Sequence, residues 1–177
     1  MKKLLALVLV MALALTAGAA LADHTDNILY SWTSSSKTQN PHMYTSTTSS
    51  TRMLHLGTFV RQMVSKDGTH LEFVPEHAAE LPTSEDGGLT WIVKLREGLK
   101  WTDGTPIDAY TYEYSIKMQI DPQLAHTAAT YVFDPVVVKN AKEYFQGKVT
   151  DWSEVGVKVL DQYTLEFDLE YPCTDID

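Results

Sequence analysis

The sequence has a single cysteine, Cys173, among its 177 residues. An internal disulfide is therefore excluded, and so is a structural zinc site built on several thiolates, because such a site needs four clustered sulfur or nitrogen ligands. The six histidines do not supply those ligands, since none has another histidine two or four residues away. Glycine is also sparse, at nine residues, and forms no glycine-rich phosphate loop. We therefore expect neither a metal nor a cofactor.

Positive charge is the second shortage. The chain has 14 basic against 23 acidic side chains, a net charge of −9, and two of the basic residues are Lys2 and Lys3 at the extreme N-terminus. A chain this acidic is a poor partner for nucleic acid or for an anionic membrane surface, because both repel negative charge. We expect no binding to either.

Long apolar runs are lacking except at the start of the chain. Lys2 and Lys3 precede an apolar run from Leu4 to Leu15, and Ala20-Leu21-Ala22 forms a small-x-small site. This order is typical of a secretory signal peptide over residues 1–22, and the run is too short for a usual transmembrane helix. We expect cleavage after Ala22 and, because no cysteine follows, no lipid anchor. The product is then soluble and lies in the periplasm or outside the cell.

Hydrophobic periodicity predicts a mixed α+β chain with largely antiparallel strands and flanking helices. The expected strands cover residues 27–32, 58–64, 89–95 and 157–169, the last as a hairpin that turns at Asp161 and Gln162. The expected helices cover residues 52–56, 109–119 and about 135–146. A turn at Lys66-Asp67-Gly68 and a mixture of a short helical turn and loop over residues 76–88 complete the pattern.

Several residues define these elements more closely. Asp108 is the expected N-cap of the helix over 109–119, and Asp134 is the expected N-cap of the next, with Pro135 at its first position. That second helix should direct Val138, Ala141 and Phe145 to one face. The final strand, Leu165–Leu169, is expected to lack part of its neighbours and to leave an unpaired edge.

Aromatic side chains gather in the middle of the sequence, and they invite two interpretations. Trp91, Trp101, Tyr110, Tyr112 and Tyr114 could form a stacking platform for a ligand, since Tyr110 and Tyr114 share one helical face. Packing in the core or at its boundary is the expected role for most of them, because large aromatic side chains dominate protein cores.

One motif suggests an enzyme. Ser34-Ser35-Ser36-Lys37 fits the S-x-x-K pattern of penicillin-recognising serine enzymes, in which the serine is the nucleophile. In those enzymes the serine opens a helix, whereas here poor helix formers surround it and Pro41 follows closely. The companion S-D-N and K-T-G motifs are absent from the chain. A serine hydrolase that uses Ser34 and Lys37 therefore remains only the alternative.

The order of several short segments resembles a known family. These are D-G-G-L-T-W at 86–91, L-R-E-G-L-K-W-T-D-G-T-P at 95–106, N-A-K-E-Y-F-Q-G-K at 140–148 and G-V-K-V-L-D-Q-Y-T-L-E-F at 156–167. In this order and spacing, from about Asn27 to Pro172, the chain resembles the N-terminal part of family 5 extracellular solute-binding proteins. Those are the oligopeptide and dipeptide receptors of ABC importers.

The resemblance implies the N-terminal part of a two-lobed periplasmic-binding-protein type II fold. Residues 23–57 would be the first segment of ligand-binding lobe I, and residues 58–177 a truncated accessory α+β domain that stops before the second lobe. It implies a binding protein and not an enzyme, monomeric at full length, with a peptide or other small solute and the permease subunits of the importer as its partners.

The resemblance also implies candidate ligand contacts. Residues just after Asn40-Pro41 line the cleft in such receptors, which points to Thr45 and Thr47. The family's ligand-facing tyrosine, in a Pro-Tyr pair, is replaced here by the segment Leu124–Ala128. A family member for a nickel chelate, haem or an oligosaccharide is the alternative, because the sequence does not discriminate among these ligands.

Overall fold

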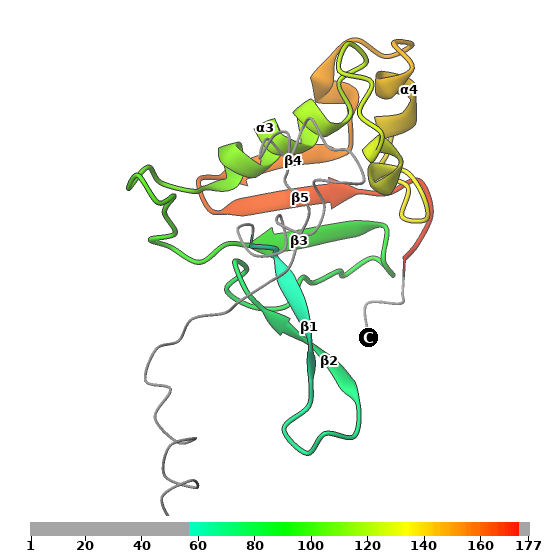
Figure 1. The fold of residues 1–177 in the computed structure, drawn as a ribbon. Coiled ribbons are helices and arrows are strands. Elements are labelled where there is room, and N and C mark those ends of the chain that lie inside the picture. Colours follow the sequence, from blue (N-terminus) through cyan, green and yellow to red (C-terminus); the bar gives the residue numbers. More distant parts are fainter. Residues whose placement is uncertain (1–56, 174–177) are drawn as a thin grey trace, which may run out of the picture. The chain divides into compact units, whose positions relative to one another are not determined.

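The computed structural model describes residues 57–173, all within the second of two units into which the chain divides, 1–33 and 34–177. Two antiparallel sheets and short helices make up this region (Figure 1). In chain order the elements are β1 (Val60–Val64), β2 (Leu71–Pro75), β3 (Thr90–Lys94), α3 (Ala109–Gln119), η3 (Ala129–Val132), α4 (Ala141–Phe145), η4 (Trp152–Glu154), β4 (Val157–Asp161) and β5 (Thr164–Asp168). The expected elements over 27–32 and 52–56 lie outside the described residues. None of the helices in the described region has both the length and the apolarity needed to cross a bilayer.

The larger sheet has the strand order β3-β5-β4, so the last strand in the sequence is the central one. β5 pairs antiparallel with β3, Val93 opposite Leu165, and with β4, Val159 opposite Leu165. The hairpin predicted over 157–169 is therefore confirmed. The expected unpaired edge on the final strand is wrong, because β3, which lies 70 residues earlier in the sequence, pairs with the edge of β5 that β4 leaves free.

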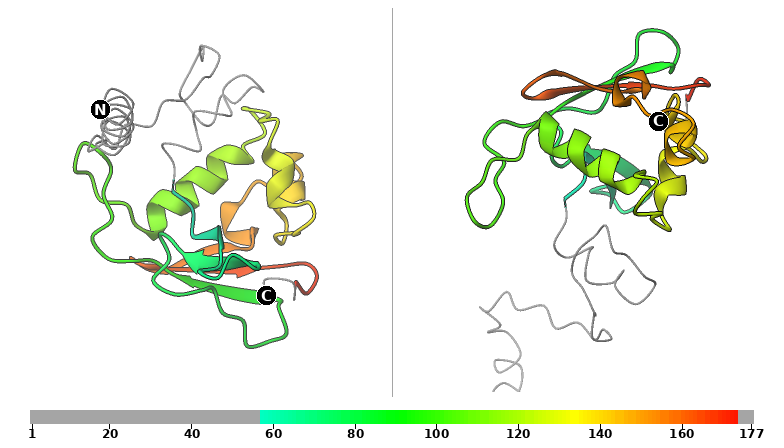
Figure 2. Two further views of the ribbon diagram at one scale, coloured as in Figure 1. Left: turned by 60° about the horizontal axis from the view of Figure 1, so that its bottom comes forward. Right: turned by 90° about the horizontal axis from the view of Figure 1, so that it is seen from above.

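The sheet is amphipathic, and its apolar face supports the core. Val93 and Leu165 are buried, and both pack against Ala109 at the start of α3. A second cluster centres on Ile120 and Val155. Figure 2 shows α3 and α4 on one side of this sheet. The alternation predicted for residues 89–95 is confirmed over its second half, since Val93 and Leu95 are buried whereas Lys94 is exposed. At its start the prediction is wrong, because Leu89 precedes β3 and is 38% exposed.

The outer edge of β3 is covered by the segment that follows β2. Ala78 bridges to Leu95 and Thr83 bridges to Ile92, both antiparallel. The short helical turn expected in residues 76–88 is therefore wrong. Pairing with an exposed strand edge satisfies the backbone groups of this segment, and an extended conformation is required for that pairing.

The helix predicted over 109–119 is confirmed at both ends. The Asp108 side chain accepts a hydrogen bond from the Thr111 N–H at 3.0 Å, and the Thr111 hydroxyl accepts one from the Asp108 N–H. This capping box satisfies backbone donors that a helix start otherwise leaves unpaired. The helix ends at Ile120, before Asp121 and Pro122.

The aromatic side chains divide differently from the expectation. Trp91 and Tyr112 are partly buried against the two core clusters, as predicted. Trp101, Tyr110 and Tyr114 are 46%, 56% and 63% exposed, so the expected packing role is wrong for these three. Trp101 lies in a tight turn, and α3 turns Tyr110 and Tyr114 away from the sheet, which contacts the opposite side of the helix.

The helix predicted from Asp134 and Pro135 is also wrong, because α4 begins only at Ala141. The intervening backbone is used for long-range pairing: Val138 bridges to Leu169, and the Lys139 N–H donates to the Asp168 carbonyl at 2.9 Å. Residues that pair with the end of β5 are not available for a helix. Val138, Ala141 and Phe145 do pack in one core cluster, but the helical face predicted for them is wrong, because Val138 precedes α4.

The smaller sheet is the β1–β2 hairpin. β1 confirms the strand predicted over 58–64, although it begins at Val60, and the turn at 66–68 is confirmed with Gly68 at a φ of 73°. A side chain at this φ would be strained, which explains the glycine. The second strand, Leu71–Pro75, was missing from the sequence prediction.

The central position of β5 yields a stability prediction. Leu165 is fully buried, so Leu165→Ala should lower the free energy of unfolding by about 2–5 kcal/mol through lost burial and a cavity. Leu160→Ala removes the same atoms from a side chain that is 52% exposed, and should cost about 0.5 kcal/mol or less. Urea unfolding of the purified protein measures both. Equal costs would contradict the placement of β5 at the centre of the sheet.

Candidate functional site

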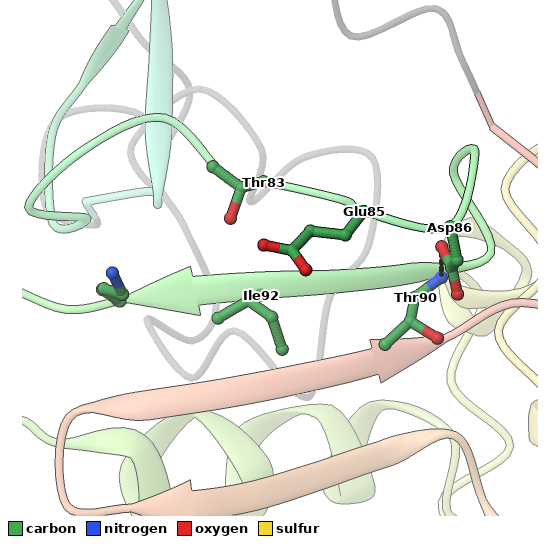
Figure 3. Close-up of a pocket in the computed structure, with 6 residues that line it drawn as sticks. Thr83, Glu85, Asp86, Thr90 and Ile92 are labelled. Atoms are coloured by element: carbon green, nitrogen blue, oxygen red, sulfur yellow. Dashed lines mark hydrogen bonds between the residues drawn. The ribbon is translucent and has the colours of Figure 1, made fainter.

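The site residues predicted from the sequence, Thr45 and Thr47, lie outside the described residues, as do Ser34 and Lys37. The described region offers a hollow of about 460 Å³ beside β3 (Figure 3). Six residues line it: Thr83, Glu85, Asp86, Thr90, Ile92 and Lys94.

The hollow is formed by the polar face of β3 and the segment that covers its edge. Thr90, Ile92 and Lys94 alternate with the buried residues of the strand and so point outward. The Thr83 N–H donates to the Ile92 carbonyl at 3.1 Å, and the Ile92 N–H donates back at 2.8 Å. Figure 3 shows the Glu85 side chain reaching from the covering segment toward the strand. The result is a shallow surface with an isoleucine floor and a carboxylate above it.

Asp86 fixes the end of this hollow. Its carboxylate accepts a hydrogen bond from the backbone N–H of Thr90 at 2.9 Å (Figure 3). It also accepts bonds from the backbone N–H of Leu89 at 3.1 Å and from the Ser84 hydroxyl at 2.9 Å. These bonds, those from Thr90 first, lower the pKa of Asp86 to about 2. The carboxylate thus acts as a turn cap that starts β3 after Gly87 and Gly88.

Charged pairs cover the rest of the outer face. The Lys158 amino group lies 2.6 Å from Asp168 and 2.8 Å from Glu166, and its pKa is raised by these bonds, the one to Asp168 first. Lys94 pairs with Glu80 at 3.0 Å, with both side chains more than half exposed. Exposed pairs contribute little to stability, so they serve mainly to neutralise the face.

These groups suit at most weak binding of hydrogen-bond donors, because the hollow is lined by two carboxylates, Glu85 and Asp86, of which Asp86 already accepts bonds from the turn, and by the amino group of Lys94. The surface is too open to exclude water, and a good ligand pocket encloses most of its ligand. Within residues 57–173, no group of three or more His, Cys, Asp or Glu side chains is arranged to hold a metal ion.

A second polar centre lies where the chain joins this region, at Gly57–Phe59. The Thr58 N–H and hydroxyl each donate to Glu76 at 2.8 Å, and Arg61 forms an ion pair with the same carboxylate. Burial alone would raise the pKa of Glu76, but the hydrogen bonds from Thr58 and the charge of Arg61 outweigh it, and the pKa is lowered. The Phe59 ring lies 4.3 Å from that of Tyr112 between centroids, which anchors the joint in the core.

His77 and Tyr112 complete this joint. The Tyr112 hydroxyl is hydrogen-bonded to His77 Nδ1, and burial, together with the charge of Glu76, raises the pKa of Tyr112. A Cβ at Gly57 would collide with the His77 ring. The joint is therefore tightly packed.

The sequence prediction missed the hollow because half of its lining, Thr83, Glu85 and Asp86, belongs to a loop. One signal was present: Ser84-Glu85-Asp86-Gly87-Gly88 combines a short acceptor side chain with two glycines, which is typical of a turn capped by aspartate. No pattern indicated that the same loop would cover the edge of β3, since that pairing depends on residues distant in the sequence.

Comparison with known proteins identifies the family. The profile described as "Bacterial extracellular solute-binding proteins, family 5 Middle" matches residues 72–176, more than half of the chain. The probable deoxycholate-binding periplasmic protein YgiS of Escherichia coli is 38% identical over 49% of this chain and 16% of its own length. The periplasmic oligopeptide-binding protein OppA of the same organism is 37% identical over 46% of this chain and 15% of its own length.

Solved structures give the same result. Listeria monocytogenes OppA bound to peptide aligns with a TM-score of 0.53 at 36% identity, over 64% of this chain and 21% of that chain. Haemophilus influenzae OppA in complex with RPPGFSPFR aligns with a TM-score of 0.63 over 78% of this chain and 26% of that chain. At 23% identity, the second alignment supports the fold alone.

The chain belongs to the family 5 bacterial extracellular solute-binding proteins. The resemblance inferred from the sequence is thus confirmed, and so is the fold class, part of a type II periplasmic-binding-protein fold. Family members are solute-binding proteins rather than enzymes. The chain spans about a sixth of the length of the two curated relatives.

The cap at Asp86 predicts how stability depends on pH. The pKa of Asp86 is lowered to about 2 in the folded protein, whereas an aspartate in the unfolded chain has a pKa of about 3.9. The ionised carboxylate therefore stabilises the fold at pH values above about 3.9, and this stabilisation is lost as the pH falls through the pKa of the folded protein. Asp86→Asn should therefore lower the melting temperature at pH 6, and its difference from the unmodified protein should shrink between about pH 4 and pH 2.

Glu85→Gln is the matched control, because it removes the same charge one residue away from a side chain with no described hydrogen bond. Melting temperatures recorded by circular dichroism at several pH values test both variants. If the difference in melting temperature between Asp86→Asn and the unmodified protein stays constant down to pH 2, the charge of Asp86 does not stabilise the turn.

Proposed function

We propose that the chain is part of the substrate-binding component of an ABC importer that captures oligopeptides or dipeptides outside the cytoplasmic membrane. The observation that carries this proposal is the family match over residues 72–176. It is supported by relatives above 30% identity that are named for oligopeptide binding in Escherichia coli and Bacillus subtilis. A third relative, the periplasmic murein peptide-binding protein MppA of Escherichia coli, is also named for peptide binding.

In this proposal residues 23–57 belong to lobe I and residues 58–177 to the accessory domain. Thr45 and Thr47 are the ligand contacts within the chain. Small hydroxyl side chains can donate to and accept from a peptide backbone without reading its side chains.

The proposed partners are the permease subunits of the importer, and the full-length receptor works as a monomer without enzymatic activity. The rival function, a serine hydrolase that uses Ser34 and Lys37, makes an opposite prediction about covalent chemistry. A fluorescent penicillin should leave the protein unlabelled if it is a binding protein. Labelling that Ser34→Ala abolishes would establish the enzyme instead.

Export is a separate prediction of this proposal. Residues 1–22 should be removed during secretion, because Ala20-Leu21-Ala22 is the well-placed small-x-small site. Mass spectrometry of the protein from the periplasmic or secreted fraction should show Asp23 at the N-terminus. Recovery of Lys2 and Lys3 in a membrane fraction would show that the leader acts as an anchor.

Peptide affinity is the central test. The mature chain, residues 23–177, should show no saturable binding of tri- to pentapeptides below about 1 mM, where the binding free energy is only about −4 kcal/mol. A few hydrogen bonds of about 0.5–1.5 kcal/mol each do not offset the 4 kcal/mol or more, roughly, of lost translational and rotational freedom. Calorimetric titration with a mixed peptide library measures this directly.

The longer protein encoded by a reading frame that continues the family pattern should bind at micromolar concentration, because two lobes enclose the ligand and exclude water. Thr45→Val with Thr47→Val should weaken that binding. A longer protein that binds deoxycholate, a nickel chelate, haem or an oligosaccharide but no peptide would retain the family and overturn the peptide assignment. Micromolar, stoichiometric binding by the mature chain, residues 23–177, would show that the site is complete within it.

A further inference from the structure

The hydrogen bonds of the β1–β2 hairpin fix which backbone groups its two outer edges present. At the base of the hairpin the Glu76 N–H donates to the Phe59 carbonyl at 2.9 Å, and at its turn the Ser65 N–H donates to the His70 carbonyl at 2.9 Å. Bonded and non-bonded pairs alternate along an antiparallel ladder, and the register between these two ends is continuous, so the odd-numbered residues of β1 bond to β2. The residues of β1 whose N–H and C=O groups point away from β2 are Val60, Gln62 and Val64.

The outer edge of β2 is blocked at its base. Pro75 lies opposite Val60, so its outward side belongs to this edge, and proline has no N–H to donate there. Its carbonyl accepts a hydrogen bond from the Arg96 guanidinium at 3.0 Å. Proline on an edge strand is a common protection against the addition of a further strand. A strand therefore cannot pair along the whole of this edge.

The outer edge of β1 has no comparable protection. Its sequence, VRQMV, contains neither proline nor glycine, and every residue after Val60 is exposed. The Val60 carbonyl accepts a hydrogen bond from the Thr58 hydroxyl at 2.7 Å, but within residues 57–173 no strand pairs with this edge. Figure 1 shows the hairpin projecting away from the three-stranded sheet. The unpaired edge expected on the final strand is thus found on β1.

The side chains that flank this edge are apolar. Residues directly opposite each other share a face, and five of the six on the face of Gln62 are apolar: Val60, Val64, Leu71, Phe73 and Pro75. Val64 is 62% exposed and Leu71 58%. A two-stranded hairpin is marginally stable alone, whereas three or more strands with a hydrophobic face are stable. An open edge beside an apolar face is a template for pairing with another chain.

β1 complements a second copy of itself in one antiparallel register. When Gln62 lies opposite Gln62 of the second copy, Val60 lies opposite Val64, and the whole strand pairs. A slide of two residues one way pairs only residues 60–62 and sets Arg61 opposite Arg61 of the second copy, where like charges destabilise a sheet. A slide of two residues the other way pairs only residues 62–64. The strand therefore selects the register that is centred on Gln62.

We propose that two copies of this chain associate through the outer edge of β1, about a twofold axis between the Gln62 residues of the two copies. The hairpins then form one four-stranded antiparallel sheet with the order β2-β1-β1-β2. The outward backbone groups of Gln62 and Val64 gain hydrogen bonds, and Val60 packs beside Val64 of the second copy. A twofold pairing uses each β1 edge once and leaves at the outside only the edge that Pro75 blocks, so it ends at two chains. The inference concerns this chain and does not rest on the proposed function.

Opposite charges at residue 62 test the axis. Sedimentation of the purified protein at rising concentration should show one chain converting to two. Gln62 is exposed, so its replacement should leave the fold intact. Gln62→Lys and Gln62→Glu should each raise the Kd of the dimer about fivefold at low salt, because each sets like charges opposite each other. An equimolar mixture of the two variants should restore association, since a lysine then faces a glutamate.

Leu71→Lys is the matched control. Leu71 is on the same apolar face as Gln62 but on β2, so at least three strand spacings, about 14 Å, separate it from its copy. This variant should leave the dimer unchanged. In a Cys173→Ser background, a short bis-maleimide should link Gln62→Cys to its copy and should not link Leu71→Cys. Hydrogen exchange of the β4–β5 hairpin reports whether each variant remains folded.

Three outcomes would overturn the proposal. The first is a protein that stays monomeric up to about 1 mM, where association is worth only about −4 kcal/mol; protection of the Gln62 and Val64 amides in that monomer would mean that another part of the same chain covers the edge. The second is a dimer that Leu71→Lys disrupts and both charged variants of Gln62 retain, which would indicate packing between apolar faces. The third is a mixture of Gln62→Lys and Gln62→Glu that associates no better than either variant alone.

Discussion

The pairing of β5 on both sides is the constraint on which the rest of this region depends. It joins β4, only a turn away, to β3, which lies 70 residues earlier, and it buries Leu165 where the three strands meet. The chain between β3 and β4 has to start and end at this sheet. α3 packs over the apolar face through Ala109, and residues 138–139 pair with the end of β5 instead of joining a helix. The short helices are thus consequences of the sheet.

The two faces of the three-stranded sheet differ in polarity. The apolar side holds the core, while the polar side carries ion pairs around Lys158 and the hollow beside β3. That hollow is open to solvent. Asp86, whose pKa is lowered, accepts its hydrogen bonds from the turn before β3. Within residues 57–173, the charges on this side of the sheet are engaged in the turn at Asp86 and in the ion pairs of Lys158.

The joint at Gly57–Phe59 and the hairpin that follows it connect this domain to the rest of the chain. Glu76 holds Thr58 and Arg61, Phe59 stacks on Tyr112, and His77 leaves no room for a side chain at Gly57.

By itself, the sequence determined the local elements with strong periodicity or clear punctuation, and it determined the family. Some signals depend only on neighbours in the chain and were predictable for that reason. They are the alternation in residues 89–95 and 157–169, the helix cap at Asp108 and the helix stop at Asp121-Pro122. Tertiary structure decided the elements whose backbone pairs with distant strands. Asp134 and Pro135 carry a good helix-start signal, yet the next residues bond to the end of β5, and residues 78–83 look like a loop yet cover the edge of β3. It also decided which aromatic side chains are exposed, and it placed Glu85 and Asp86 beside a strand. Burial and strand order depend on contacts between residues far apart in the sequence, and a pattern read along the chain does not contain them.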